Sequence, residues 1–192
     1  MKRFMIICTV ALCLFVQAQA QRYLPGQKGV QFTAGTVNGL NLETQSPDFA
    51  FHAGAAFSSY TKNENRWVFG GEYLEKCFLY RDFSIPQTQI TVEGGYYLSF
   101  LSDGSKTVFF SLGASFLTGY ETVNWGKKQL PDGATIQNKD SFLYGCALTL
   151  ETEVFLTDWL VLLVSVRERV LGGSSVGLLN TEMGLGVKFI IN

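Results

Sequence analysis

Charged side chains recur at every second position in several segments whose intervening positions are apolar. Glu151 and Glu153 are the closest such pair, and on a β-strand two side chains spaced in this way lie on one face. Neighbouring carboxylates can serve as a general acid and base or as metal ligands. Arg167 and Arg169 show the same spacing, so we expect ion pairs between the two sets rather than catalysis. The whole predicted charge network comprises Glu72, Glu93, Glu151, Glu153, Arg167, Arg169, Glu182 and Lys188.

Reactive side chains are otherwise sparse. His52 is the single histidine, whereas metal sites and acid–base catalysis usually rely on several. The motif Gly126-Lys127-Lys128 lacks the earlier glycine and the following Ser or Thr of a phosphate-binding loop. We therefore predict no catalytic residues, no metal site, no cofactor and a protein that is not an enzyme. A barrel enzyme acting on lipid would need an apolar slot beside a reactive cluster, which the charged, glycine-rich face disfavours.

The elements that carry these residues are predicted to be β-strands, because apolar and polar residues alternate with period two. Segment 49–60 is the clearest case, with Phe49, Phe51 and Phe57 on one face. Most of the segments are about ten residues or longer, as a tilted strand needs in order to cross a bilayer, whereas globular strands average about five or six. We predict an all-β fold, a small up-and-down antiparallel β-barrel of about eight strands and of outer-membrane type. The segments are 30–37, 49–60, 66–80, 88–101, 107–121, 141–155, 159–171 and 181–191.

The connections between these segments alternate in length. Short turns on one rim and longer loops on the other are typical of bacterial outer-membrane barrels, with the turns in the periplasm. The longest loop, 122–140, supplies the candidate contact residues Trp125, Lys127, Lys128 and Asp132, because binding residues concentrate in loops. A solvated loop without a partner fits these residues equally. The turns are 61–65, 102–106 and 156–158, and the loops are 38–48, 81–87, 122–140 and 172–180.

The polar face of the strands is expected to line the inside of the barrel. Closure by eight strands leaves an interior just wide enough for side chains, and charges enclosed there must be paired. We predict that Arg167 and Arg169 pair with several glutamates across the lumen and plug it. Trp67 and Trp159 would then belong to the aromatic girdles at the membrane boundary. The alternative is a soluble sandwich or lipocalin-like barrel, whose inner face would be apolar.

The N-terminus has the features of a secretory signal peptide. Two basic residues precede an apolar run that is shorter than a spanning helix, and small residues then allow cleavage between Ala20 and Gln21. The predicted division is a cleaved signal peptide, 1–20, and a barrel domain, 21–192. Cleavage lowers Lys plus Arg from 15 to 13 against 16 Asp plus Glu, a net charge of about −3 that argues against direct nucleic-acid binding. Two cysteines remain, and their spacing leaves open whether they form a disulfide.

Several short motifs resemble, in their order along nearly the whole chain, the TraO family of conjugal transfer proteins. They are QRYLPGQKG at 21–29, GGEY at 70–73, IP at 85–86, EGGY at 93–96, GYETVN at 119–124, LTLETE at 148–153 and GLGVKF at 184–189. The resemblance implies a structural, non-enzymatic component of the transfer apparatus of conjugative transposons, which is similar to a type IV secretion system. It would lie in the outer membrane of a Gram-negative bacterium, with other conjugation-apparatus proteins and outer-membrane lipid as partners and no small-molecule substrate. The alternative is a stand-alone small outer-membrane barrel for adhesion or envelope stability.

Overall fold

The computed structural model describes residues 23–37, 49–81, 83–137, 140–174 and 178–191. The predicted signal peptide, its cleavage site at Ala20 and Gln21, and the predicted loop 38–48 lie outside these residues. No helix within the described ranges is long and apolar enough to cross a membrane. The elements are β1 (Lys28–Val37), β2 (Phe49–Tyr60), η1 (Lys62–Glu64), β3 (Arg66–Tyr80), β4 (Phe83–Ser102), β5 (Val108–Val123), η2 (Asn124–Gly126), β6 (Ser141–Phe155), β7 (Leu160–Gly172) and β8 (Leu179–Ile191).

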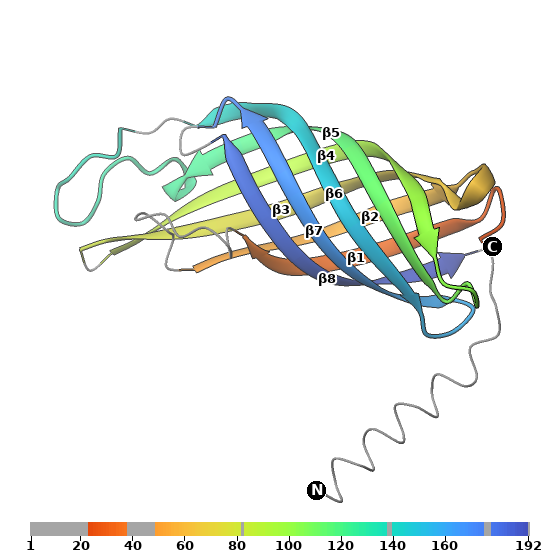
Figure 1. The fold of residues 1–192 in the computed structure, drawn as a ribbon. Coiled ribbons are helices and arrows are strands. Elements are labelled where there is room, and N and C mark those ends of the chain that lie inside the picture. The colour runs from red at the N-terminus through yellow and green to blue at the C-terminus, as the bar shows by residue number, and fades with distance from the viewer. Residues whose placement is uncertain (1–22, 38–48, 82, 138–139, 175–177, 192) are drawn as a thin grey trace, which may run out of the picture.

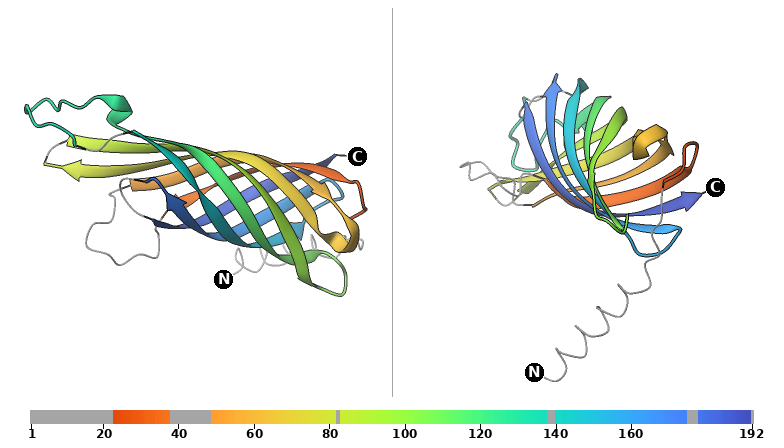
Figure 2. Two further views of the ribbon diagram at one scale, coloured as in Figure 1. Left: turned by 90° about the horizontal axis from the view of Figure 1, so that it is seen from above. Right: turned by 45° about the vertical axis from the view of Figure 1, so that its right-hand side comes forward.

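The eight strands form a closed antiparallel barrel in sequence order (Figure 1). Each strand pairs with the next one, and β1 pairs with β8 from Lys28 opposite Ile191 to Val37 opposite Glu182. Closure lets the backbone N–H and C=O groups of the wall bond within the sheet, which a membrane interior requires. The strands tilt around the barrel axis in all views (Figure 2). The predicted fold class is therefore confirmed.

The strand bounds agree with the sequence pattern except around 81–87. That segment was predicted to be a long loop, and this prediction is wrong, because β4 already begins at Phe83 and pairs with the end of β3. The ladder continues because β3 itself runs to Tyr80, and Pro86 is tolerated near the open end of a sheet. Pairing with β2 stops at Cys77 and pairing with β5 stops at Gln87. The tip of the β3–β4 hairpin therefore extends beyond the barrel wall (Figure 1).

The two rims of the barrel differ. At the rim that we call the turn end, short connections join β2 to β3, β4 to β5 and β6 to β7. At the opposite rim, the loop end, the connection from β5 to β6 contains η2 and an isolated bridge between Gln129 and Thr135. The described chain begins and ends at the turn end, which is the pattern of an up-and-down barrel with an even number of strands.

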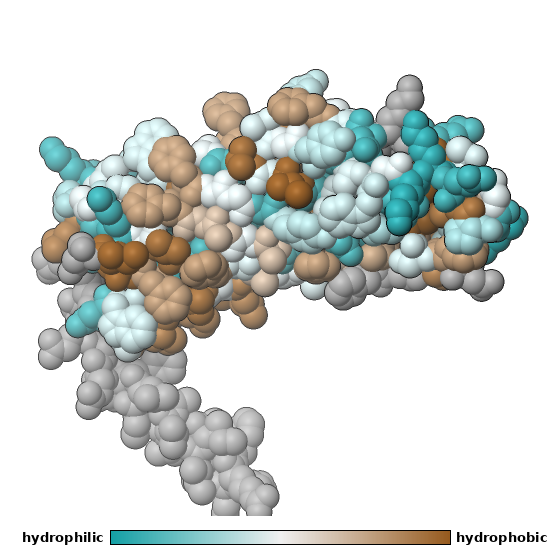
Figure 3. All heavy atoms as spheres, turned by 180° about the vertical axis from the view of Figure 1, so that it is seen from behind, coloured by the Kyte–Doolittle hydropathy of each residue, from teal (hydrophilic) through white to brown (hydrophobic). Residues whose placement is uncertain are grey.

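The outward face of the wall is apolar. Phe116 and Leu148, for example, expose 81% and 62% of their surfaces, as expected of side chains that contact lipid rather than a protein core. Hydrophilic side chains gather instead toward the loop end (Figure 3). Trp67 and Trp159 are exposed near the turn end, and Tyr144 near the loop end. Cys77 and Cys146 are both free thiols.

Candidate functional site: the charged lumen

Packed rings close the lumen at the turn end. Tyr23, which precedes β1, stacks on Tyr60 with 3.8 Å between the ring centroids. It also contacts Phe109 and Phe155 at centroid distances of 5.1 and 4.9 Å. Its hydroxyl group donates a hydrogen bond of 2.9 Å to Glu153 Oε2. The segment before β1 is thus anchored inside the barrel and connected to the charges beneath it.

The next layer, which we call the turn-end ion cluster, contains Arg66, Glu151, Glu153 and Lys188. Arg66 is fully buried and lies 2.5 Å from Glu151 Oε1 and 3.2 Å from Glu153 Oε2. Lys188 forms a second ion pair with Glu153 and lies 3.8 Å from Glu151 Oε1. Two cations therefore balance two carboxylates, which is the condition under which buried charges are tolerated.

Further toward the loop end lies the central ion cluster of Glu72, Glu93, Arg167, Arg169 and Glu182. Arg169 Nη1 is 2.6 Å from Oε1 of both Glu72 and Glu182. Arg167 reaches Glu93 Oε1 at 3.0 Å and Glu72 Oε2 at 3.4 Å. These contacts join β3, β4, β7 and β8 across the lumen. Side chains from opposite walls thus hold one another in place where a channel would otherwise pass.

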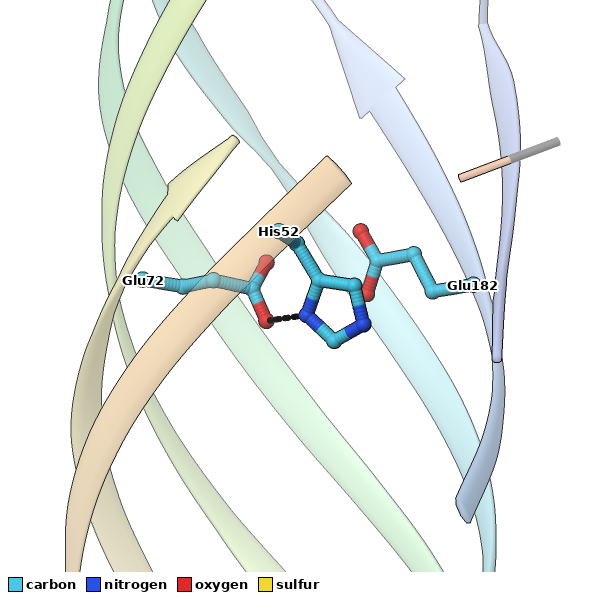
Figure 4. A group of neighbouring side chains, drawn as sticks. All are labelled: His52, Glu72 and Glu182. Atoms are coloured by element: carbon cyan, nitrogen blue, oxygen red, sulfur yellow. Dashed lines mark ion pairs between the residues drawn. The ribbon is translucent and has the colours of Figure 1, made fainter. Parts of the chain in front are cut away.

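His52 lies against this cluster. Its Nδ1 atom is 3.4 Å from Glu72 Oε2, and Glu182 approaches the ring from the other side (Figure 4). The central ion cluster has three carboxylates and two guanidinium groups, so with a neutral His52 it carries one excess negative charge. His52, Glu72 and Glu182 are the described residues whose ligand atoms lie close enough together to hold a metal ion.

Polar and apolar side chains share the loop end of the lumen. Lys76 donates a hydrogen bond to Asn180, and Glu121 accepts bonds of 2.8 and 2.9 Å from Gln87 and Gln89. Leucine side chains from β5, β6 and β7 pack beside them as a small buried cluster. Side chains therefore occupy the lumen from one end to the other.

One predicted set of ion pairs is wrong. We expected Glu151 and Glu153 to pair with Arg167 and Arg169, but both glutamates contact Arg66 and Lys188. The register explains the difference, since Arg167 stands opposite Thr149 and Arg169 opposite Ala147, whereas Glu151 stands opposite Ser165. The arginines therefore lie nearer to the loop end than these glutamates do. They contact Glu72, Glu93 and Glu182 instead, which belong to the same predicted network.

Three buried lumen residues, Arg66, Lys76 and Tyr97, are not among those predicted from sequence. The sequence pattern could have identified each of them, because each lies an even number of positions from a residue on the polar face of its strand. Arg66 and Lys76 alternate in phase with Glu72, and Tyr97 with Glu93. Parity therefore groups these large side chains with the polar face that lines the lumen.

The candidate contact residues of loop 122–140 lie outside the lumen. Trp125 belongs to η2 and exposes 61% of its surface, and Lys127 and Lys128 are also exposed. Asp132 accepts a hydrogen bond of 3.2 Å from Arg81, at the tip of the β3–β4 hairpin. The loop is thus tied to the hairpin, while its tryptophan and lysines face away from the barrel contacts.

A closed barrel with long tilted strands, an apolar outer face and a charged lumen is an outer-membrane β-barrel in its architecture. Solved structures of that class resemble it. Neisserial surface protein A shares 16% identity over 84% of this chain and 96% of its own, with a TM-score of 0.57. The attachment invasion locus protein Ail of Yersinia pestis, solved with the heparin analogue sucrose octasulfate, shares 11% identity over 88% and 100%, with a TM-score of 0.52. At such identities the likeness shows the fold alone.

The chain belongs to the TraO family, since the model of "Conjugative transposon protein TraO" matches residues 24–191. A comparison with curated proteins finds no significant match. The predicted family is confirmed. The protein is therefore an outer-membrane-type barrel of a conjugative-transposon family.

Proposed function

We propose that this protein is a non-enzymatic, structural component of a conjugative DNA-transfer apparatus in the outer membrane. The observation that carries the proposal is the filled lumen. Two ion clusters and an aromatic plug span it, and Arg66, Arg169 and Lys188 are almost completely buried within it. Neither DNA nor a soluble substrate can pass through a lumen of this kind, so the barrel acts through its outer surfaces and its two rims.

Family membership indicates the system in which these surfaces work. Proteins encoded by conjugative transposons serve the movement of the element between cells, and a barrel is suited to anchor such machinery in the outer membrane. The partners would be other proteins of the transfer apparatus. We infer that the turn end faces the periplasm and that the loop end faces outward, as in other barrels with short turns on one rim.

Export fits the same proposal. Residues 1–20 would direct the chain across the inner membrane and be removed between Ala20 and Gln21. The mature chain would then begin just before Tyr23, whose ring lies in the turn end of the lumen. The outward wall would contact outer-membrane lipid.

Deletion of the gene in a donor strain tests the function. We expect the transfer frequency to fall at least tenfold and to return when the wild-type gene is supplied in trans. Unchanged transfer after deletion would refute the proposal. Membrane fractionation and a mobility shift on boiling provide the matching check that the complementing protein is a folded outer-membrane barrel.

A stand-alone barrel for adhesion or envelope stability is the second candidate, favoured by the exposed side chains of Trp125, Lys127 and Lys128. A variant with all three replaced by alanine separates the two functions. Normal transfer together with lost attachment of the cells to a surface would support adhesion. Reduced transfer with normal folding would instead place a contact of the apparatus on this loop.

A further inference from the structure

The His52 side chain lies in a space that two glycines leave open. Gly35 on β1 stands opposite both His52 on β2 and Gly184 on β8. A Cβ atom at Gly35 would lie 2.7 Å from His52 Nε2 and 1.9 Å from the Met183 carbonyl oxygen. A Cβ atom at Gly184 would lie 3.2 Å from His52 Cε1. The absence of side chains at Gly35 and Gly184 therefore leaves room for the imidazole ring, and a larger residue at either position would displace it.

The polar atoms around this ring are arranged so that some have no hydrogen-bond partner. Arg169 binds Oε1 of both Glu72 and Glu182 at 2.6 Å, which fixes the two carboxylates from one side. Glu182 Oε2 then lacks a hydrogen-bond partner, although Glu182 is 1% exposed. The His52 ring is 4% exposed and faces Glu72 Oε2 through Nδ1 at 3.4 Å. A buried polar atom without a partner is costly, so the position of Glu182 Oε2 beside the imidazole ring indicates a ligand.

The charges of the lumen also favour a bound cation. The described lumen has six buried or nearly buried carboxylates, of Glu72, Glu93, Glu121, Glu151, Glu153 and Glu182. It has five basic side chains, those of Arg66, Lys76, Arg167, Arg169 and Lys188. The deficit of one positive charge falls in the central ion cluster, beside His52.

We propose that His52, Glu72 and Glu182 bind a divalent transition-metal ion, of which Zn²⁺ is the representative. Imidazole nitrogen and carboxylate oxygen are ligands that Zn²⁺ accepts at about 2.0–2.2 Å. The three ligand atoms lie within 4.8 Å of one another (Figure 4), and a tetrahedral site needs about 3.3–3.5 Å. The glutamate side chains would therefore have to move toward His52 when the ion binds.

The surroundings favour this ion over harder ones. A polar cavity of about 20 Å³ adjoins His52, Glu72 and Glu182, which exceeds the roughly 10–15 Å³ that one water molecule requires. Arg169 acts as a positioning residue, since it holds Oε1 of each carboxylate, as partners of metal ligands commonly do. Glu182 Oε2 is left for the metal, whereas Glu72 Oε2 also contacts Arg167 Nη1 at 3.4 Å. The nearby guanidinium groups disfavour ions held by charge alone, such as Ca²⁺, whereas Zn²⁺ gains from nitrogen ligation.

Zinc titration of the mature barrel, refolded in detergent and purified without a polyhistidine tag, tests the proposal. We expect one Zn²⁺ per chain in competition with a chromophoric chelator. His52→Ala and Glu182→Gln are expected to weaken binding at least roughly 100-fold. Glu168→Gln is the matched control, because this carboxylate lies on the outer face of β7 and accepts a hydrogen bond from Thr181. Absence of stoichiometric binding, or equal binding by all four proteins, would overturn the proposal.

A second measurement uses the wild-type protein alone and does not depend on folding of the variants. Because the sequence contains one histidine, ¹⁵N-histidine labelling gives one imidazole, whose nitrogen shifts distinguish metal ligation from protonation. A shift on addition of Zn²⁺ at constant pH supports the metal site. A resonance that responds to pH but not to Zn²⁺ would show that a proton alone supplies the missing charge, and the metal site would be rejected.

Discussion

Replacement of Arg66 by methionine removes one of the two cations of the turn-end ion cluster and keeps most of the side-chain volume. Arg66 is 0% exposed and contacts Glu151, Glu153 and the Ser111 hydroxyl group. Without it, Lys188 is the remaining cation against two buried carboxylates. The variant therefore leaves one carboxylate charge buried without compensation.

The expected loss follows from that uncompensated charge. Removal of one partner from a buried ion pair costs about 3–5 kcal/mol, a large part of the roughly 5–15 kcal/mol that stabilises most folded domains. With a dependence on urea of about 2 kcal/mol per molar, the unfolding midpoint should fall by roughly 1.5–2.5 M. The combined change of Arg66→Met and Glu151→Gln restores equal charge and should recover part of this loss.

The assay is urea unfolding in detergent, followed by the fraction of barrel that keeps its fast mobility on an unheated gel. Arg81→Met is the control, because Arg81 forms an ion pair with Asp132 at 3.2 Å and its side chain is 68% exposed. Exposed ion pairs contribute about 0–1 kcal/mol. If Arg66→Met and Arg81→Met shift the midpoint equally, the lumen charges do not stabilise the barrel as we describe.

Three further changes test other parts of the structure. Leu148→Arg places a charge on the lipid-facing wall and should lower the free energy of unfolding, measured by refolding into a bilayer, by about 2–4 kcal/mol. Leu178→Arg at the loop end should lower it by about 0–1 kcal/mol. Similar losses would contradict the position of Leu148 inside the membrane and of Leu178 at its edge. Tyr23→Ala removes a ring of the turn-end plug and should cost roughly 3 kcal/mol in urea unfolding, and an unchanged midpoint would mean that the plug is dispensable. Burial opposes ionisation of Asp103, but hydrogen bonds from a nearby serine hydroxyl and backbone N–H groups hold the pKa of its carboxyl below the usual value. The hydrogen bond from the Val108 N–H group to the Asp103 carboxylate should therefore persist above the unfolded pKa of about 3.9 and be lost only as the pH falls through the lower folded pKa. Protection of the Val108 amide against hydrogen exchange measures this loss. Protection that is independent of pH, or equal in Asp103→Asn, would contradict the prediction.

The strands could be predicted from sequence because one face meets lipid and the other meets polar side chains. This contrast gives β2, β3 and β6 an uninterrupted period of two, and their bounds agree with the prediction. The start of β4 could not be found in this way. From Phe83 to Pro86 the side chains are half-buried or exposed without a buried face, so the contrast that marks a strand disappears although the ladder with β3 continues.

The pairing of the lumen charges shows a second limit. Alternation assigns Glu151 and Arg167 to the inner face, but it contains no information on their heights along the barrel axis. Height depends on the stagger between strands, which closure of the whole barrel sets. The pairing of Arg167 with Thr149 moves the arginines past Glu151 and toward Glu72. Sequence therefore predicted most of the charged residues that meet in the lumen, but it missed Arg66 and Lys76 and did not give the individual partners.

The length of β4 makes it longer than the membrane is thick. Its 20 residues extend roughly 66 Å at about 3.3 Å each, or roughly 50 Å along the membrane normal at a tilt of about 40°. The hydrocarbon core is about 30 Å thick, so roughly 20 Å of β4 lies outside it, divided between its two ends. A fluorophore attached near Arg81 would sit on a paired two-stranded hairpin that extends beyond the barrel wall. With the loop end facing outward, as proposed, energy transfer from this site to a dye in the envelope of a recipient cell would report how closely the two cells approach.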